Sequence, residues 1–398
     1  MSVKVMAVNA GSSSLKFKLF EMPDEIVITD GVVERIGLED AYFTIRVNGE
    51  KKKQVLPIKD HGVAVQMLLD ALISEHIVND ISEIKGVGHR IVQGGWYFDD
   101  SVLVDDKVIA EIDELCDLAP LHNPAHLIGI RAFMNALPGV PNVTVFDTSF
   151  HQSMAEEAYM YAIPYEWYEK YHIRKYGAHG TSHKYVATRC AALMGKPIED
   201  LKIVTCHLGN GASLCAIEDG KCKDTSMGLT PLEGIPMGTR SGNLDPTVVS
   251  YICNKLNLNA TEVVTMLNKK SGYLGVSGVS NDSRDLEAAM AAGNDRARLA
   301  LDIQYKRIAD YIGSYYVLLG GIDAIVFTAG IGENSPRCRR EVVKRLGVLG
   351  VEIDEEKNNV RGEEILISTQ KSKIKVFIIP TDEELVIARD VMRLAHIK

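Results

Sequence analysis

One kind of turn occurs twice in this chain, and each copy joins two runs of strand-forming residues. Residues 8–17 read Val-Asn-Ala-Gly-Ser-Ser-Ser-Leu-Lys-Phe, and residues 206–215 read Cys-His-Leu-Gly-Asn-Gly-Ala-Ser-Leu-Cys. Small residues in such a turn leave backbone N–H groups and short hydroxyls exposed, and these hold phosphate oxygens well. Two unrelated β-hairpins would use the same Asn and Gly residues. The repetition favours a duplicated fold that closes on a nucleotide.

The length and charge of the chain limit what it can be. A chain of 398 residues is too long for one ordinary core, so two domains are expected. The net charge of −9 argues against nucleic acid or an anionic membrane as the main partner. Seven cysteines without a Cys-x-x-Cys pair predict reduced thiols, a cytoplasmic location and no structural zinc. We expect no signal peptide and no membrane helix, because the chain opens directly into a strand pattern and no apolar run approaches roughly 20 residues.

Hydrophobic periodicity divides the chain into strands and helices of an α/β protein. Strands are expected at residues 3–8, 15–20, 41–47, 86–92, 142–147, 202–207, 323–327 and 375–379, and helices at 61–74, 106–116, 182–194, 295–319, 337–346 and 382–395. A glycine-rich turn is expected at 328–334, where it would place the next helix N-terminus against a phosphate or a nucleotide. The second domain begins near residue 150 without a Pro-rich linker, which predicts a tight hinge.

Two charged residues stand where buried strands end. Arg90 precedes Gly94-Gly95, and from there its planar guanidinium could clamp a carboxylate or a phosphate; a structural salt bridge is the alternative. Asp147 closes the strand at 142–147, and ligands of open α/β sheets gather at the carboxyl ends of strands. An aspartate that caps the next helix would give the same pattern.

Histidine and arginine residues in glycine-flanked loops form a second group of candidates. His179 and His183 have the spacing of two metal ligands on a helix, but Gly180 and Ser182, a helix-capping residue, favour a loop and a phosphate-contacting His179. Arg240 precedes Ser-Gly, a setting suited to stabilising a transferring phosphoryl group. The Walker A and protein-kinase glycine motifs are both absent, so another kind of phosphotransfer fold is expected.

Four further candidate residues also have an ordinary structural explanation. Lys16 follows the first turn at a spacing that would let it reach a phosphate, although a surface lysine on an alternating strand would look the same, and Asn9 and Ser12 are equally ambiguous. His122 lies in the apolar loop Leu-Ala-Pro-Leu-His-Asn-Pro and is expected to be a hydrogen-bonded packing residue.

Together these segments resemble the acetate/propionate kinase family over essentially the whole chain. The motifs are Asn9-Ala-Gly-Ser-Ser-Ser-Leu-Lys16, Gly88-His-Arg90, Leu118-Ala-Pro-Leu-His122-Asn-Pro124, Val145-Phe-Asp147-Thr, His179-Gly-Thr-Ser-His183, His207-Leu-Gly-Asn-Gly211, Met237-Gly-Thr-Arg240-Ser-Gly242, Gly330-Ile-Gly-Glu-Asn334 and Thr381-Asp-Glu-Glu-Leu385. The resemblance implies two duplicated α/β lobes of the actin, hexokinase and Hsp70 type with a nucleotide cleft between them. Residues 1–149 and 384–398 would form the carboxylate-substrate lobe, closed by the C-terminal helix, and residues 150–383 the nucleotide-binding lobe.

The resemblance also implies an activity and its site. The family is homodimeric and transfers phosphate reversibly between ATP and acetate, giving acetyl phosphate and ADP with Mg²⁺; Mn²⁺ is an alternative metal. The carried-over catalytic residues are Asp147, His179 and Arg240, and the substrate residues are Arg90, Val92, Leu121, His122, Ala178 and Pro231. Nucleotide contacts fall on Asn9, Ser12, Ser14, Lys16, His207, Leu208, Gly209, Asn210, Gly211, Asp282, Ser283, Arg284, Gly330, Ile331, Gly332, Glu333 and Asn334, and the metal positions are Asn9 and Glu383.

Chemistry qualifies the role of Asp147. A carboxylic acid titrates near pH ~4, so acetate arrives ionised and needs no base to become a nucleophile. Asp147 is therefore expected to orient Arg90, His179 or a metal-bound water, and catalysis is expected to rest on in-line positioning, charge stabilisation and the exclusion of water.

Three positions depart from the family pattern: Gln93 stands where a histidine is expected, Asp382 where asparagine is usual, and Ala178 where phenylalanine often lines the acetate methyl pocket. The loss of a phenyl ring at Ala178 motivates a propionate or other short-chain carboxylate kinase as an alternative, although one methylene changes binding by only about 1–3 kcal/mol. A pyrophosphate-dependent enzyme would need an obstructed adenine pocket, and Ile331 gives no sign of one. An actin- or Hsp70-like nucleotide switch would have no use for the charged residues gathered here.

Overall fold

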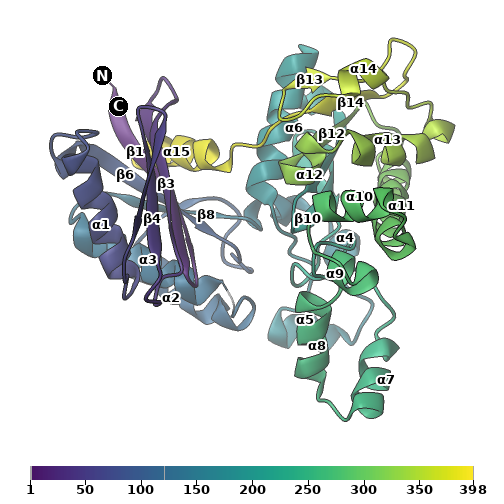
Figure 1. Ribbon diagram of the computed structural model, residues 1–398, viewed down its shortest axis with the longest axis horizontal. Helices are drawn as coiled ribbons and strands as arrows, with labels where there is room; N and C mark the ends of the chain where they lie inside the picture. Colours follow the sequence, from purple (N-terminus) through teal and green to yellow (C-terminus); the bar gives the residue numbers. More distant parts are fainter. Residues whose placement is uncertain (1, 121, 398) are drawn as a thin grey trace. The chain divides into compact units, whose positions relative to one another are not determined.

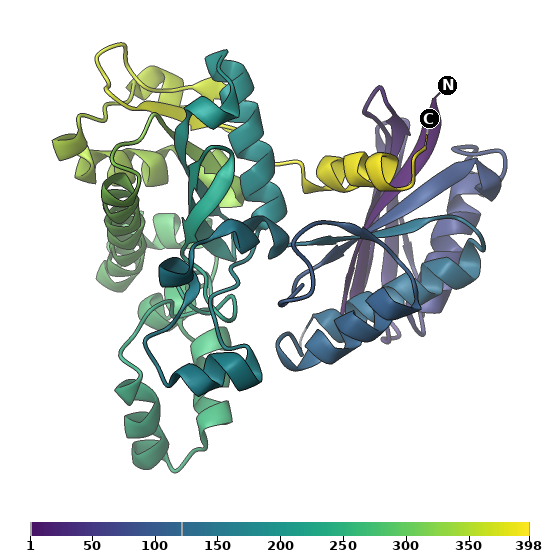
Figure 2. The ribbon, with the colours of Figure 1, turned by 180° about the vertical axis from the view of Figure 1, so that it is seen from behind.

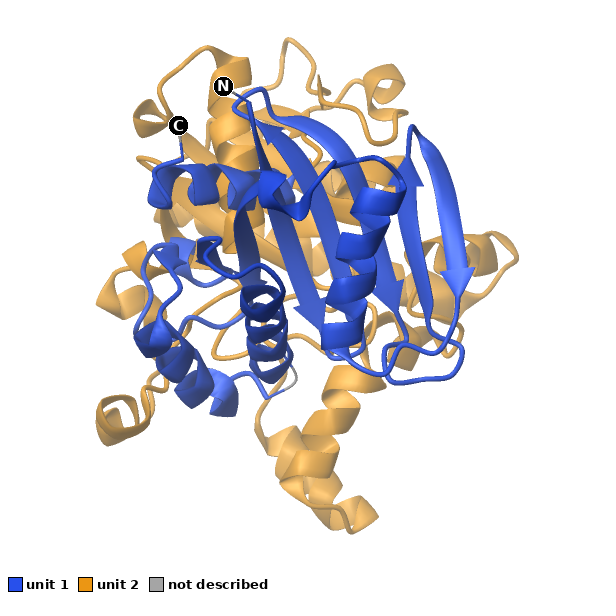
Figure 3. Ribbon diagram, turned by 90° about the vertical axis from the view of Figure 1, so that its left-hand side faces the viewer, with its two compact units in different colours: residues 1–150, 382–398 blue, residues 151–381 orange. Residues whose placement is uncertain are grey.

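The computed structural model describes residues 2–120 and 122–397, which form two compact units (Figure 3). Unit 1 comprises Met1–Phe150 and Asp382–Lys398, and unit 2 comprises His151–Thr381. Phe150, Asp382 and Glu383 thus belong to the first unit, whereas the predicted boundaries assign them to the second. The reason is that Asp382 caps the final helix through the N–H of Leu385, and that helix packs on the first sheet.

Unit 1 is built on an eight-stranded sheet with the order β5-β4-β3-β2-β1-β6-β8-β7. Its strands are β1 (Val3–Gly11), β2 (Ser14–Met22), β3 (Ile26–Glu34), β4 (Tyr42–Val47), β5 (Glu50–Val55), β6 (Ile84–Ile91), β7 (Val102–Leu103) and β8 (Asn142–Phe146). β1 pairs antiparallel with β2 through the first turn and parallel with β6, which in turn pairs parallel with β8. The carboxyl ends of β1, β6 and β8 therefore lie at one edge of this sheet.

Helices cover both faces of this sheet (Figures 1 and 2). On one face α1 (His61–Ser74) and α3 (Asn123–Ala136) lie side by side, with α2 (Asp106–Glu114) next to α3. On the other face α15 (Glu383–Leu394) packs so closely that a β-carbon on Gly88 would come within 2.2 Å of Ile387. Because strand residues alternate between faces, Arg90 faces the α15 side with Gly88, while His89 faces α3 and meets Phe133 edge to face.

Unit 2 contains a six-stranded sheet with the order β11-β10-β9-β12-β14-β13. Its strands are β9 (Lys202–Leu208), β10 (Ala212–Glu218), β11 (Lys221–Thr225), β12 (Ala324–Thr328), β13 (Ile365–Leu366) and β14 (Lys375–Ile378). The helices are α4 (Glu156–Tyr159), α5 (Tyr165–Tyr171), α6 (Gly180–Met194), α7 (Thr247–Leu256), α8 (Ala260–Lys269), α9 (Gly272–Ser277), α10 (Ser283–Ala291), α11 (Asp295–Leu318), α12 (Ala329–Asn334), α13 (Pro336–Arg345) and α14 (Glu355–Asn358). The buried face of α11 joins the core through Tyr305, Ile308, Ile312 and Tyr315.

The two sheets repeat one topology, which confirms the predicted duplication. The order β3-β2-β1-β6-β8 in unit 1 corresponds to β11-β10-β9-β12-β14 in unit 2. In unit 1, β1 pairs antiparallel with β2 and parallel with β6, and β6 pairs parallel with β8. In unit 2, β9 likewise pairs antiparallel with β10 and parallel with β12, and β12 pairs parallel with β14. Both repeated turns are the hairpin turns at the same place in this order. Within the described residues, none of the helices has the length and apolarity needed to cross a bilayer.

Two local predictions about the second unit are wrong. Ala329–Asn334 form the short helix α12 where a glycine-rich turn was expected, because Ala329 adopts φ 62° and redirects the chain directly into a helix. Helix α6 begins at Gly180 and not at Ser182, whose hydroxyl bonds to His207 instead of capping the helix. His179 occupies the N-cap position in the left-handed region, with φ 58°. A non-glycine residue held there is strained, and such strain gathers at functional sites.

His89 makes the stability of unit 1 sensitive to acid. It is buried, donates a hydrogen bond from Nε2 to Asn142 Oδ1 at 2.8 Å, and burial lowers its pKa to about 4. In the unfolded chain this histidine is protonated below about pH 6.5, whereas in the folded chain it stays neutral down to about pH 4. The free energy of unfolding therefore decreases as the pH falls from 6.5 to 4. Burial also lowers the pKa of His126, to about 3, which acts in the same direction.

We expect His89→Gln to remove its share of this sensitivity. The difference between the free energies of unfolding at pH 7.5 and pH 5 should shrink by about 2 kcal/mol relative to the parent chain. Urea unfolding at the two pH values measures it, with His396→Gln, at an exposed histidine, as the matched control. An unchanged difference in His89→Gln would contradict this assignment.

Candidate active site

In unit 1, side chains of opposite charge meet on the α15 face at the carboxyl ends of β6 and β8. Arg90 Nε donates to Asp147 Oδ1 at 2.9 Å, and Nη2 donates to Oδ2 at 2.7 Å. Asp147 is buried, and the backbone continues the sheet because the Asp147 N–H bonds to Ile91 O at 2.8 Å. This two-point geometry fixes the plane of the guanidinium. Among the described residues nothing accepts from Nη1 of Arg90, so this nitrogen remains available to a ligand.

A third charged group, Glu383, reaches the same place from the N-terminus of α15. Burial raises its pKa to about 7; Arg90 counteracts this shift, and the charge of Asp147 adds to it. In the described part of the chain its Oε1 is buried without any hydrogen-bond partner. An orphaned carboxylate oxygen suits a hard cation such as Mg²⁺, which prefers oxygen ligands and keeps several waters. The residue therefore fits a metal position.

The first hairpin brings the predicted phosphate-contacting residues to the same edge of the first sheet. Asn9 and Lys16 are paired across β1 and β2, and Asn9 lies on the α15 face because it alternates with Val8, which faces the core under α3. Ser12 is exposed in the turn, and Ser14 begins β2. These positions suit contacts with an anion or a metal water.

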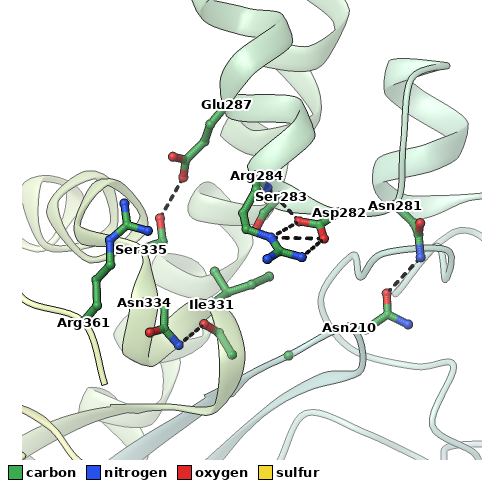
Figure 4. Close-up of a pocket in the computed structure, with 12 residues that line it drawn as sticks. Asn210, Asn281, Asp282, Ser283, Arg284, Glu287, Ile331, Asn334, Ser335 and Arg361 are labelled. Atoms are coloured by element: carbon green, nitrogen blue, oxygen red, sulfur yellow. Dashed lines mark hydrogen bonds and ion pairs between the residues drawn. The ribbon is translucent and has the colours of Figure 1, made fainter. Parts of the chain in front are cut away.

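In unit 2, three separate segments line a cavity of about 870 Å³ (Figure 4). They are the β9–β10 turn with Gly209 and Asn210, the first half of α10 with the residues before it (281–287), and helix α12 with the N-cap of α13; Arg361 adds a side chain from the loop between α14 and β13. The lining residues are Gly209, Asn210, Asn281, Asp282, Ser283, Arg284, Glu287, Gly330, Ile331, Asn334, Ser335 and Arg361. The size is that of a pocket for a small organic ligand, and two helix N-termini contribute to it. The second repeated turn thus lies on a cavity.

Not every predicted nucleotide residue lines this cavity. His207, Leu208, Gly211, Gly332 and Glu333 do not, and the residues of the first hairpin belong to unit 1. The Glu333 carboxylate instead accepts the N–H of Ala329 at 2.7 Å and of Thr381 at 3.2 Å, which holds the start of α12.

Four lining residues were not predicted as site residues: Asn281, Glu287, Ser335 and Arg361. Ser335 had a sequence signal, because Ser-Pro at the start of a charged helix marks an N-cap, and its hydroxyl accepts the N–H of Cys338. Arg361 lies in a loop between α14 and β13 and had no such signal.

Next to the second turn, Arg240 and His179 converge on one point. A β-carbon on Gly211 would lie 3.3 Å from Arg240 Nη1 and 3.5 Å from His179 Nε2, so only a glycine leaves this space open. Arg240 Nη1 donates to the carbonyl of Pro231 at 3.2 Å. Among the described residues no carboxylate pairs with Arg240, and burial lowers its pKa. A partly buried guanidinium without a counter-charge indicates an anionic ligand.

The ring of His179 is held by its neighbours. Its Nδ1 lies 2.8 Å from Ser213 Oγ, and its ring stacks on that of His207 with centroids 4.1 Å apart. The same Ser213 hydroxyl contacts His183 Nε2 at 2.8 Å. These contacts leave Nε2 of His179 pointing to the space beside Gly211. Ser213 therefore acts as a positioning residue that sequence reasoning missed, since it lies inside an ordinary strand.

Ser213→Ala should weaken catalysis without abolishing it. Loss of the hydroxyl removes the hydrogen bond that orients His179, and the loss of such an orienting partner typically costs about 10–100-fold in activity. We expect kcat to fall by about 10-fold or more, with little change in the affinity for a ligand of the cavity. The matched control is Ser226→Ala, a buried serine directly after β11 whose hydroxyl accepts a backbone N–H from Leu214. Equal effects of the two substitutions would contradict a special role for Ser213.

The predicted apolar wall residues are distributed over both units. Val92 follows β6, His122 stands at the N-terminus of α3, and Ala178 and Pro231 belong to unit 2. Leu121 lies outside the described residues. Ala178 is buried in the core cluster of unit 2, and its carbonyl accepts a hydrogen bond from His151 Nε2 at 2.9 Å. Gln93, which stands where the family pattern has a histidine, is buried, and its side-chain oxygen accepts the N–H of Gly95 at 2.9 Å.

Comparison with known proteins assigns the chain to a family. The model of the acetokinase family matches residues 4–389. An acetate kinase of Geobacillus kaustophilus is 60% identical over 394 residues, which is 99% of this chain and 100% of that protein. The crystal structure of Porphyromonas gingivalis acetate kinase superposes with a TM-score of 0.95 at 44% identity, covering 99% of this chain and 100% of the other. A propionate kinase from Francisella tularensis gives a TM-score of 0.93 at 40% identity, covering 98% and 100%. The chain belongs to the acetokinase family.

Proposed function

We propose that this chain is an acetate kinase, which reversibly transfers a phosphoryl group from ATP to acetate. The observation that carries the proposal is the convergence of His179 and Arg240 beside Gly211, next to a cavity of about 870 Å³, where Arg240 has no carboxylate partner among the described residues. A nucleotide in the cavity would place its phosphates at this turn. The full-length similarity to acetate kinases supports the choice of substrate.

Unit 1 supplies the residues for the carboxylate. Arg90, held by Asp147 through two hydrogen bonds, presents Nη1 to the acetate oxygen that does not react. Asp147 accepts no proton, because acetate is already ionised near neutral pH. His179 and Arg240 donate to the phosphoryl oxygens, where negative charge must be stabilised in the transition state. Transfer is then direct and in line.

Asn9 and Glu383 are proposed to hold Mg²⁺, which neutralises phosphate charge when bound. From the first hairpin, Lys16, Ser12 and Ser14 are proposed to contact phosphates. In unit 2, the nucleotide is proposed to contact the β9–β10 turn, the start of α10 and helix α12. His207 would contribute by stacking on His179. Removal of the metal with EDTA should abolish turnover, and Mg²⁺ or Mn²⁺ should restore it.

Hydroxamate formation by the purified chain with Mg-ATP tests the proposal. Acetate should give acetyl hydroxamate, and propionate and butyrate define the width of the pocket. ATP hydrolysis without any acyl phosphate would contradict the kinase and favour a nucleotide switch.

The small side chain of Ala178 leads to a further expectation about the length of the carboxylic acid that the enzyme accepts. Ala178 is smaller than the phenylalanine usual in the family pattern, so propionate is expected to be used with a kcat/KM within about 10-fold of that for acetate. Ala178→Phe should lower the propionate-to-acetate ratio by a similar factor. A ratio that the substitution leaves unchanged would show that Ala178 does not border the methyl pocket.

The family resemblance also supports a homodimer and a cytoplasmic location. Sedimentation of the purified chain at several concentrations measures the first, and fractionation of cells that express it measures the second.

A further inference from the structure

Three buried side chains with metal-binding atoms meet behind the segment that leads to His179. His151 Nδ1 lies 3.1 Å from Cys222 Sγ and 4.0 Å from Cys215 Sγ, and the two sulfurs are 3.4 Å apart. All three residues are buried in unit 2. No step of the proposed reaction uses them.

The fold explains why residues so distant in sequence meet. Cys215 lies on β10 and Cys222 on β11, and the ladder between these strands shifts register between Ala216 and Ile217. Cys215 shares a face with Ile217, the partner of Cys222, so both thiols project to the same side. The 3₁₀ turn Ser149–Ser153 then places His151 over them, fixed by the bond from Ser153 Oγ to Cys222 O at 2.9 Å.

We propose that His151, Cys215 and Cys222 form a buried zinc site that anchors the turn Ser149–Ser153 to β10 and β11. Zn–S and Zn–N bonds of about 2.3 and 2.0 Å at tetrahedral angles put neighbouring ligand atoms about 3.6–3.8 Å apart. The observed separations of 3.1, 3.4 and 4.0 Å lie on both sides of these values. Ligand movements of about half an ångström would complete the geometry.

The surroundings of His151 match those of a metal ligand. Its Nε2 bonds to the carbonyl of Ala178 at 2.9 Å, so this nitrogen carries the proton and Nδ1 presents its lone pair to the sulfurs. Histidines that bind zinc are oriented in this way by a second hydrogen bond. Because Ala178 directly precedes His179, the site would also hold the backbone next to the catalytic histidine.

The ligand atoms favour zinc over a lighter divalent cation, because thiolate sulfur and imidazole nitrogen suit zinc whereas Mg²⁺ and Ca²⁺ prefer oxygen. Binding deprotonates both thiols and releases two protons, so Zn²⁺ with two thiolates and a neutral imidazole carries no net charge, which suits a fully buried place. The fourth position of the tetrahedron would be taken by water, as in other zinc sites with three protein ligands.

Metal analysis of the purified holo-chain after dialysis against EDTA tests the site. We expect about one zinc ion per chain. Cys215→Ser and Cys222→Ser should each lose at least 10-fold of this zinc, whereas Cys190→Ser, at a buried cysteine of α6, should keep it. If the first two variants do not fold, the parent chain refolded with Co²⁺ decides: thiolate-to-cobalt charge-transfer bands support the site.

Two results would overturn the proposal. One is a purified chain without zinc that also gives no thiolate–cobalt band after refolding. The other is a thiol titration in denaturant that finds two fewer thiols than the seven in the sequence, since Cys215 and Cys222 would then form a disulfide. Neither result depends on catalytic activity, so the proposed function would stand or fall separately.

Discussion

Replacing Arg240 with alanine is expected to lower kcat for acetyl phosphate formation by about 10³-fold or more, because arginines that stabilise a transferring phosphoryl group contribute about 10³–10⁵. The stability of the fold should change little. Arg240 has no carboxylate partner among the described residues, so its removal leaves no buried charge uncompensated. The KM for acetate should also change little, since Arg90 is the proposed carboxylate ligand. Hydroxamate assays and thermal unfolding of the same preparations measure both effects.

Two companion variants sharpen this test. Arg240→Lys keeps the charge but loses the planar fork, so its kcat should lie between those of the parent and the alanine variant. Arg307→Ala, on an exposed arginine of α11, should retain full activity. If Arg240→Ala kept more than about a tenth of the parental kcat, the proposed transition-state role would be wrong.

Asp147→Asn should have the second-largest effect, and its pattern distinguishes two roles. If Asp147 orients Arg90, the variant loses a two-point ion pair with one fully buried member, and unit 1 should be destabilised by about 3 kcal/mol. The KM for acetate should rise together with the fall in kcat, because the guanidinium is no longer held in place. Asp100→Asn is the matched control, as its pair with Arg393 is exposed and should cost less than about 1 kcal/mol.

A general base would give a different pattern. A fall in kcat alone, with unchanged stability and unchanged KM for acetate, would show that Asp147 removes a proton and does not position Arg90. The double variant Asp147→Asn with Arg90→Gln should be more stable than the sum of the two single changes predicts, because removing both charges avoids leaving one unpaired.

The elements with strong local patterns were predictable from the sequence. The repeated turns lie at equivalent places in two sheets of the same order, and His61–Ser74 is helical over the predicted range. The contact between Arg90 and Asp147 was predictable because both residues lie where strands end, and parallel pairing of β6 and β8 brings these ends to one edge of the sheet. Helix α12 was not predicted because two of its six residues are glycines, which are typical of turns. The chain enters this helix through the left-handed backbone conformation of Ala329.

Other features depend on tertiary contacts that no local pattern encodes. The proposed orienting role of Ser213 arises because α6 packs against β9, the neighbour of β10, and two histidines thereby reach one hydroxyl on β10. The absence of a Cys-x-x-Cys pair led to an expectation of no structural zinc, yet the cluster with His151 forms across a register shift and a 3₁₀ turn. Asp382, which stands where asparagine is usual, caps α15 through the N–H of Leu385, a role that asparagine fills equally well.

Phosphorus NMR of the reaction mixture tests the central claim most directly. The chain is incubated with Mg-ATP, once with acetate and once without it, and the phosphorus resonances are followed over time. We predict that acetyl phosphate and ADP rise together in equal amounts with acetate, and that ATP is essentially unchanged without it. Release of inorganic phosphate at the same rate in both samples, with no acetyl phosphate, would contradict the account.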